Sequence, residues 1–147
     1  MSDRYLVPGW FTNHVANPSI SALTRLGLSI RGSRVLAVRG RTSGEWRTVP
    51  VNLLDLDGAR YLVAPRGHTQ WVRNLRAAGG GELRLGRRAE RFAAVELEDD
   101  AKPLVIREYL RRWKAEVGVF FDGLDETATD EQIAAVAPGF PVFALGQ

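Results

Sequence analysis

The chain of 147 residues contains no cysteine and only two histidines, His14 and His68. The first absence excludes disulfides, thiolate nucleophiles and cysteine-ligated metals, and two imidazoles argue against a metal centre. No run of 18 apolar residues occurs, and residues 1–15 lack the basic-then-apolar order of a secretion signal. We therefore expect a cytoplasmic protein, with peripheral membrane contact left open.

Lysine is scarce too, since eighteen of the twenty basic residues are arginine. The net charge is only +3, so the composition does not require a nucleic-acid partner and we expect none. A chain of this length builds one compact core. We expect a single domain over residues 1–147, in which residues 1–15 form an N-terminal segment that can be mobile.

The residue pattern predicts a mainly β protein with added helices. β-rich runs alternate with turn signals such as Asp57-Gly58, and apolar residues at helical spacing mark segments near the N-terminus, in the middle and in the C-terminal third. We expect five or six strands in a small barrel or half-open sheet. The expected strands are 35–38, 48–56, 61–64, a hairpin over 83–95 that turns at 86–87, and 141–145. The expected helices are 17–30, 70–78 ended by the glycines 79–81, a longer one capped by Asp99-Asp100 and ended at Gly118, and 130–136.

Arginine is concentrated around the segment 39–50, which reads RGRTSGEWRTVP. Glycines, hydroxyl groups and guanidinium groups in a short turn suit a phosphate or a carboxylate-rich ligand. No G-x-G-x-x-G motif opens a helix and no phosphate-binding Gly-Lys-Ser/Thr loop occurs, so a dinucleotide fold or a P-loop enzyme is not expected. An anionic ligand is the first hypothesis.

Four stretches together resemble one protein family. They are the segment 40–50, the run YLVAPRG at 61–67, the run QWVRNLR at 70–76 and the closing PVF at 141–143. In combination they are similar to the deazaflavin-dependent nitroreductase family, over about residues 5 to 145. The resemblance implies an FMN-binding-like split β-barrel that uses reduced coenzyme F420 to reduce quinones, nitroaromatics or similar acceptors. The loop at 65–70 is shorter here than the family's usual loop, which carries a lysine and a proline.

The resemblance and the arginine turn together suggest where such a cofactor would bind. A deazaflavin has a flat ring at one end and negative charges at the other, so it needs an apolar wall beside cationic groups. Hydroxyl, backbone and guanidinium groups of the turn would meet the phosphate, while Arg66 and Arg73 could meet carboxylates. Pairing of these arginines with Glu45, Asp55 and Glu82 is the structural alternative. The predicted cofactor-binding residues are Val38, Arg39, Arg41, Thr42, Ser43, Gly44, Arg47, Thr48, Pro50, Val51, Ala64, Pro65, Arg66, Gly67, Trp71, Arg73 and Asn74.

The acceptor would lie over the ring, against aromatic residues. By resemblance, these are Trp10, Phe11, Phe120 and Phe121, and core packing or a hydrophobic staple are the alternatives for them. His68 is a candidate proton donor, although a lone loop histidine is usually just solvated. Because the cofactor carries out hydride transfer, no catalytic residue is assigned.

Three other functions remain open at this point. Related barrels bind FMN with similar groups, so an FMN-binding reductase is one alternative, and a noncatalytic deazaflavin carrier is another. A basic nucleic-acid-binding barrel with stacking tryptophans is a third, weakened by the lack of spaced surface aromatics. By analogy with such barrels, a homodimer is plausible.

Overall fold

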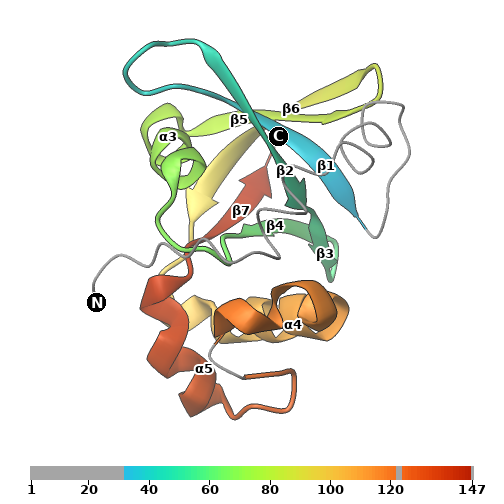
Figure 1. The fold of residues 1–147 in the computed structure, drawn as a ribbon, viewed down its shortest axis with the longest axis vertical. Coiled ribbons are helices and arrows are strands. Elements are labelled where there is room, and N and C mark those ends of the chain that lie inside the picture. The colour runs from blue at the N-terminus through green and yellow to red at the C-terminus, as the bar shows by residue number, and fades with distance from the viewer. Residues whose placement is uncertain (1–31, 122–123, 147) are drawn as a thin grey trace.

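The fold is that of a computed structural model, which describes residues 32–121 and 124–146 (Figure 1). The predicted helix at 17–30 and the segment 1–15 lie outside the described residues. The elements are β1 (Ser33–Arg39), β2 (Trp46–Asn52), β3 (Leu54–Leu56), β4 (Ala59–Val63), α3 (Gln70–Ala78), β5 (Gly80–Leu85), β6 (Arg88–Glu96), the 3₁₀ turn η1 (Asp99–Ala101), α4 (Pro103–Val117), η2 (Gly118–Phe121), α5 (Asp130–Val136), η3 (Ala137–Gly139) and β7 (Val142–Gly146).

The seven strands form one curled antiparallel sheet in the order β2-β1-β5-β6-β7-β4-β3. The two outer strands of this order, β2 and β3, are consecutive in the chain and are separated only by Leu53. A flat sheet could not place its opposite edges one residue apart, so the sheet must curl into a barrel-like form. The prediction of a mainly β split barrel is confirmed.

The strand count differs from the prediction because the run 48–56 contains two strands. Leu53 interrupts it by donating its backbone N–H to the carbonyl oxygen of Gly32 at 2.9 Å, outside the ladder. The hairpin signal at Asp57-Gly58 is confirmed. Both residues have positive φ, 51° and 81°, as a two-residue type I′ turn between β3 and β4 requires.

The glycines 79–81, predicted to end the helix at 70–78, divide between two roles. Only Gly79 ends α3, in the left-handed conformation with φ 73°. Gly80 and Gly81 already belong to β5. A Cβ atom on Gly80 would stand 2.3 Å from the carbonyl oxygen of Phe92, and one on Gly81 would stand 2.6 Å from that of Ala37. Close approach of the neighbouring strands therefore explains these two glycines.

Two apolar clusters make up the core. One fills the curled sheet and the inner face of α3, with Leu36, Val38, Val72, Leu75 and Phe143 among its members. The other lies between the β3-β4-β7 side of the sheet and the pair α4 and α5, which Figure 1 shows together below the sheet. The first cluster supports the wall of the cleft described below.

The C-terminal helices follow the sequence signals with one shift. α5 spans Asp130–Val136 as predicted and begins with a capping box between Thr129 and Gln132. Asp99 and Asp100, predicted to cap the longer helix, instead form η1, and α4 starts only at Pro103 because a proline suits the first helical position. In the part of the chain that the structure describes, no helix has the length and apolarity needed to cross a membrane.

Candidate functional site

A cleft of about 630 Å³ opens between the turn after β1, the start of β2 and the N-terminal half of α3. It brings together nine of the seventeen predicted cofactor-binding residues: Val38, Arg41, Thr42, Ser43, Arg47, Thr48, Arg66, Trp71 and Asn74. Four further residues line it that the sequence reasoning missed: Gly40, Val49, Thr69 and Gln70. Segments 30 residues apart in sequence thus meet in one site.

Signals for two of the missed residues were present in the sequence. Val49 stands two positions after Arg47 on β2, and alternate strand residues share a face. Gln70 stands four positions before Asn74 on α3, and such residues share a helix face. The strand period and the helix period therefore predict Val49 and Gln70 as neighbours of Arg47 and Asn74.

The turn at 40–45 is held rigid by its own backbone. The N–H of Gly40 donates to the carbonyl oxygen of Glu45, and the N–H of Gly44 donates to that of Gly40, both at 2.8 Å. The Ser43 hydroxyl accepts the N–H of Glu45 at 3.1 Å and keeps its own proton for donation. Gly44 has φ 74°, and a Cβ atom there would meet nothing within 4 Å. The turn therefore offers a fixed hydroxyl donor beside open space.

Arg41 is positioned by α3 through neutral groups. Its guanidinium Nη1 donates to Asn74 Oδ1 at 2.8 Å and to Gln70 Oε1 at 2.9 Å, and its backbone N–H also donates to Asn74 Oδ1 at 3.1 Å. Asn74 is buried, so this anchor is fixed by packing. Amide oxygens orient a guanidinium without cancelling its charge. Arg41 therefore presents its positive charge in the cleft.

Arg47 is held more loosely. Its nearest ion-pair partner is Glu45 at 3.9 Å, and the two side chains are 63% and 74% exposed. A contact of that length between exposed groups contributes little. Arg47 can reorient toward a ligand at small cost.

Arg39 is a predicted cofactor-binding residue that contacts the turn and Trp46 in this structure. It lies outside the cleft lining, its Nη1 donates to the carbonyl oxygen of Gly44 at 3.1 Å, and its guanidinium stacks over Trp46 at 4.2 Å. Side chains alternate between strand faces, so Val38 and Arg39 point in opposite directions. Arg39 stabilises the turn from the far side.

Seven further predicted residues also lie outside the lining of the cleft. Arg73 uses its Nε to donate to the carbonyl oxygen of His68 at 3.0 Å, and Ala64 is buried in the barrel cluster. The full set is Gly44, Pro50, Val51, Ala64, Pro65, Gly67 and Arg73. Several belong to the elements that carry the lining, so they shape the cleft from behind.

The cleft has one apolar side and one polar side. Val38, Val49 and Trp71 supply the apolar side, and the Trp71 ring is held near Phe143 with ring centroids 6.2 Å apart. Thr69 contributes a buried hydroxyl that has no hydrogen-bond partner among the described residues. A cationic turn, an unpartnered hydroxyl and an apolar wall fit a flat ring with an anionic tail.

Two of the four predicted acceptor-pocket residues, Phe120 and Phe121, lie outside the lining of this cleft. Phe120 and Phe121 are fully buried in the cluster under the sheet, where Phe121 stacks on Phe140 with centroids 4.1 Å apart. In this structure both side chains pack in the core, which was the alternative to a place in the acceptor pocket. Trp10 and Phe11 lie outside the described residues.

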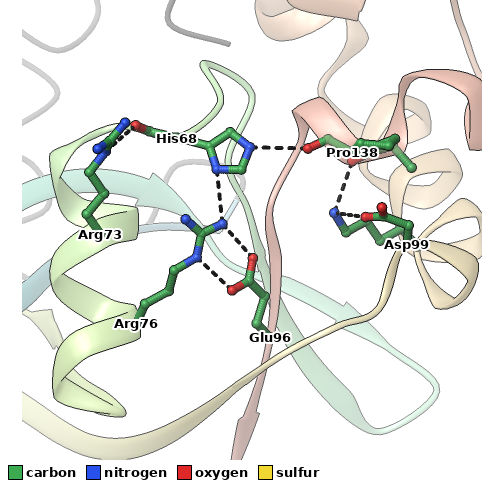
Figure 2. A network of polar contacts seen from close by, with 8 residues as sticks. His68, Arg73, Arg76, Glu96, Asp99 and Pro138 are labelled. Atoms are coloured by element: carbon green, nitrogen blue, oxygen red, sulfur yellow. Dashed lines mark hydrogen bonds and ion pairs between the residues drawn. The ribbon is translucent and has the colours of Figure 1, made fainter. Parts of the chain in front are cut away.

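His68 is engaged at both ring nitrogens, with Arg76 and with the carbonyl oxygen of Pro138 (Figure 2). A ring with both nitrogens in use is poorly placed to give a proton to a substrate. Within residues 32–121 and 124–146, no group of three or more metal-ligating side chains gathers.

Comparison with solved structures supports the fold. One similar structure, described as a domain-swapped dimer, has a TM-score of 0.56 at 19% identity and covers 92% of this chain and 96% of its own. An F420-H2 dependent reductase (FDR-A) has a TM-score of 0.52 at 21% identity, with coverages of 78% and 94%. The heme storage protein HutZ from Vibrio cholerae has a TM-score of 0.52 at 15% identity, with coverages of 88% and 87%.

Comparison of sequences is more specific than the fold. No curated protein matches the chain significantly. The family model described as F420H(2)-dependent quinone reductase matches residues 21–127, which include the turn, β2 and α3. The matched range covers well over half of the chain, so the chain belongs to the F420H2-dependent quinone reductase family of oxidoreductases.

Proposed function

We propose that the protein binds reduced F420 in the cleft between the 40–45 turn and α3, and passes a hydride to a flat hydrophobic acceptor such as a quinone or a nitroaromatic. The observation that carries this proposal is Arg41, a guanidinium held in the cleft by neutral amide oxygens beside an apolar wall. Family membership supports F420 as the cofactor.

In this proposal the polar and the apolar side chains of the cleft bind different parts of the cofactor. Arg41, Arg47 and Arg66, with the Ser43 hydroxyl, would hold the phosphate and carboxylates of the tail. Val38, Val49 and Trp71 would bound the ring and exclude water from one of its faces. The bound coenzyme supplies the hydride, and the chain's part is to hold ring and acceptor in contact.

Titration of the purified protein with F420, FMN and heme tests the cofactor. We expect binding of F420 that is clearly tighter than binding of the other two. Oxidation of F420H2 is then followed in the presence of menadione and of a nitroaromatic. Tight binding without oxidation by either acceptor would favour a carrier protein, and preferential FMN binding would overturn the proposal.

Arg47→Ala tests the anion contact separately from the fold. Hydrogen bonds to charged groups contribute about 1.5 to 3 kcal/mol, so the dissociation constant for F420 should rise about tenfold or more. Thermal unfolding should stay unchanged, because among the described residues Arg47 has a single long, exposed ion-pair contact, to Glu45. An unchanged dissociation constant for F420 at moderate salt would show that Arg47 does not contact the anionic part of the cofactor.

A homodimer is part of the proposal. It is supported by the similar structure described as a domain-swapped dimer, which covers nearly the whole of this chain. Sedimentation velocity over a range of protein concentrations would test it, and a single monomer peak at every concentration would contradict it.

A further inference from the structure

The short loop between β4 and α3 carries part of the cleft wall. Arg66 and Thr69 both line the cleft, and they stand on either side of Gly67 and His68. The loop is folded on itself: the N–H of Gly67 donates to the carbonyl oxygen of Ala64 at 3.1 Å, and the N–H of Thr69 donates to that of Gly67 at 2.9 Å. Arg73 of α3 holds the backbone of the loop as well: its N–H donates to the carbonyl oxygen of Thr69 at 3.1 Å, and its Nε donates to that of His68 at 3.0 Å. The ring of His68 adds contacts to parts of the molecule that these bonds do not reach.

His68 ties this loop to two other parts of the molecule. Its Nδ1 lies 3.1 Å from Arg76 Nη2, and its Nε2 lies 3.1 Å from the carbonyl oxygen of Pro138. An arginine can only donate and a carbonyl can only accept. The ring is therefore neutral, with its proton on Nε2 and its lone pair on Nδ1 facing Arg76.

Both anchors of the ring are themselves fixed (Figure 2). Arg76 of α3 forms a two-bonded ion pair with Glu96 of β6, with Nε and Nη2 each 2.7 Å from a carboxylate oxygen. Pro138 lies in η3, where the buried Lys102 donates to the neighbouring carbonyl oxygen of Ala137 at 3.0 Å. The imidazole thus connects the cleft loop to α3 and β6 on one side and to η3 on the other.

We propose that His68 is a positioning residue for the cofactor: its neutral ring holds the loop so that Arg66 and Thr69 form the cleft wall. The idea rests on the proposed function, because the wall matters only if a ligand binds there. The His68 side chain is half-buried and both of its ring nitrogens make polar contacts, which fits a role as a polar brace. The side chain acts through Arg66 and Thr69 and does not itself touch the ligand.

The first test is a double-mutant cycle on F420 binding. Glutamine offers one acceptor and one donor at a similar reach, whereas leucine keeps the bulk and removes both. We expect His68→Leu to weaken F420 binding about three- to tenfold and His68→Gln to stay within about twofold of the wild type. In an Arg66→Ala background the effect of His68→Leu should shrink markedly, because the brace then has less to position. An effect that is fully additive with Arg66→Ala, or no effect of His68→Leu, would overturn the proposal.

The second test needs no cofactor and separates this proposal from the proposed function. Amide hydrogen exchange at Gly67 and Thr69 reports the loop directly, since both N–H groups donate within it. Their exchange should be several-fold faster in His68→Leu than in His68→Gln, while amides of β1 exchange alike in both. Equal exchange at Gly67 and Thr69 in the two variants would contradict the proposal that the His68 ring holds the loop. If instead the wild type failed to bind F420 while the exchange result held, the proposed function would fail, and the contacts of His68 would still be shown to hold the loop. Should His68→Leu not fold, His68→Asn replaces it, because the shorter amide can accept from Arg76 but cannot reach Pro138.

Discussion

Arg41 in the cleft and two arginines outside its lining, Arg60 and Arg76, are held by different kinds of partner. Arg41 donates to two amide oxygens of α3 at 2.8 and 2.9 Å. Arg60 forms a two-bonded pair with Glu90 at 2.9 and 2.6 Å, and Arg76 does the same with Glu96 at 2.7 Å. The first arrangement fixes a cation and leaves its charge available, whereas the second cancels it.

The ionisation of the carboxylate pair shows the same difference. The hydrogen bond from Arg60 holds the pKa of the Glu90 carboxyl below its ordinary value, and that bond raises the pKa of Arg60. Each member of the pair thus stabilises the charged form of the other. An arginine already matched in this way has little left for a ligand. We propose that the kind of partner separates Arg41, as a ligand-binding position, from structural positions such as Arg60.

Removing Arg41 should give the largest effect. Arg41→Ala deletes a positioned cation, so the dissociation constant for F420 should rise about ten- to hundredfold. Isothermal titration measures it, with Arg88→Ala as the matched control because Arg88 is exposed on β6 and outside the cleft lining. Equal losses in the two variants would mean that net charge alone attracts the cofactor.

Asn74→Asp should change Arg41 from an arginine held by amide oxygens into one paired with a carboxylate. The substitution keeps the shape of the side chain and places a carboxylate at the atom that now accepts from Arg41 at 2.8 Å. Part of the cationic field in the cleft is then cancelled, so F420 binding should weaken about three- to tenfold. Circular dichroism should show a retained fold. Tighter binding in this variant would show that orientation of Arg41 matters and its free charge does not.

Gln70→Glu is the matched control for the Asn74→Asp substitution. It puts the new carboxylate on the exposed partner of the same Nη1, where water screens the pair. The loss of affinity should be smaller than for Asn74→Asp. A larger loss would place the important contact at Gln70.

The fold was predictable because its signals are local. Asp57-Gly58 specifies a two-residue turn, and the start of α3 at Gln70 and its end before Gly79 follow from periodicity and a left-handed cap. What could not be read locally was the split of the run 48–56 at Leu53, because the bond that interrupts it is made to Gly32, 21 residues away. The roles of Gly80 and Gly81 likewise depend on strands that come near only in the fold.

The candidate site was predictable as a turn and a helix but not as a set of partners. The arginine turn and the QWVRN run were identified, and the structure brings them together at Arg41 and Asn74. Arg39 belongs to the predicted set but lies outside the cleft lining, and the composition of a turn does not say which face a strand-end residue occupies. Phe120 and Phe121 were assigned by resemblance, and burial in the cluster under the sheet could not be read from two adjacent aromatics.

Glu90→Gln should give the smallest effect, and on stability instead of binding. The folded-state pKa of Glu90 is lowered, so the pair with Arg60 contributes stability above the ordinary value of 4.5 and loses it as the pH falls through the lowered value. The Glu90 side chain is 47% exposed and that of Arg60 is 24% exposed, so solvent screening keeps the contribution near 0.5 kcal/mol, to order of magnitude. Urea denaturation should show the variant slightly less stable than the wild type at pH 7, with the difference shrinking as the pH falls through the lowered pKa of Glu90. F420 binding should be the same in both proteins, because a carboxylate-paired arginine on β4 has no part in the cleft. A loss of affinity in Glu90→Gln comparable to that in Asn74→Asp would break the distinction between the two kinds of arginine.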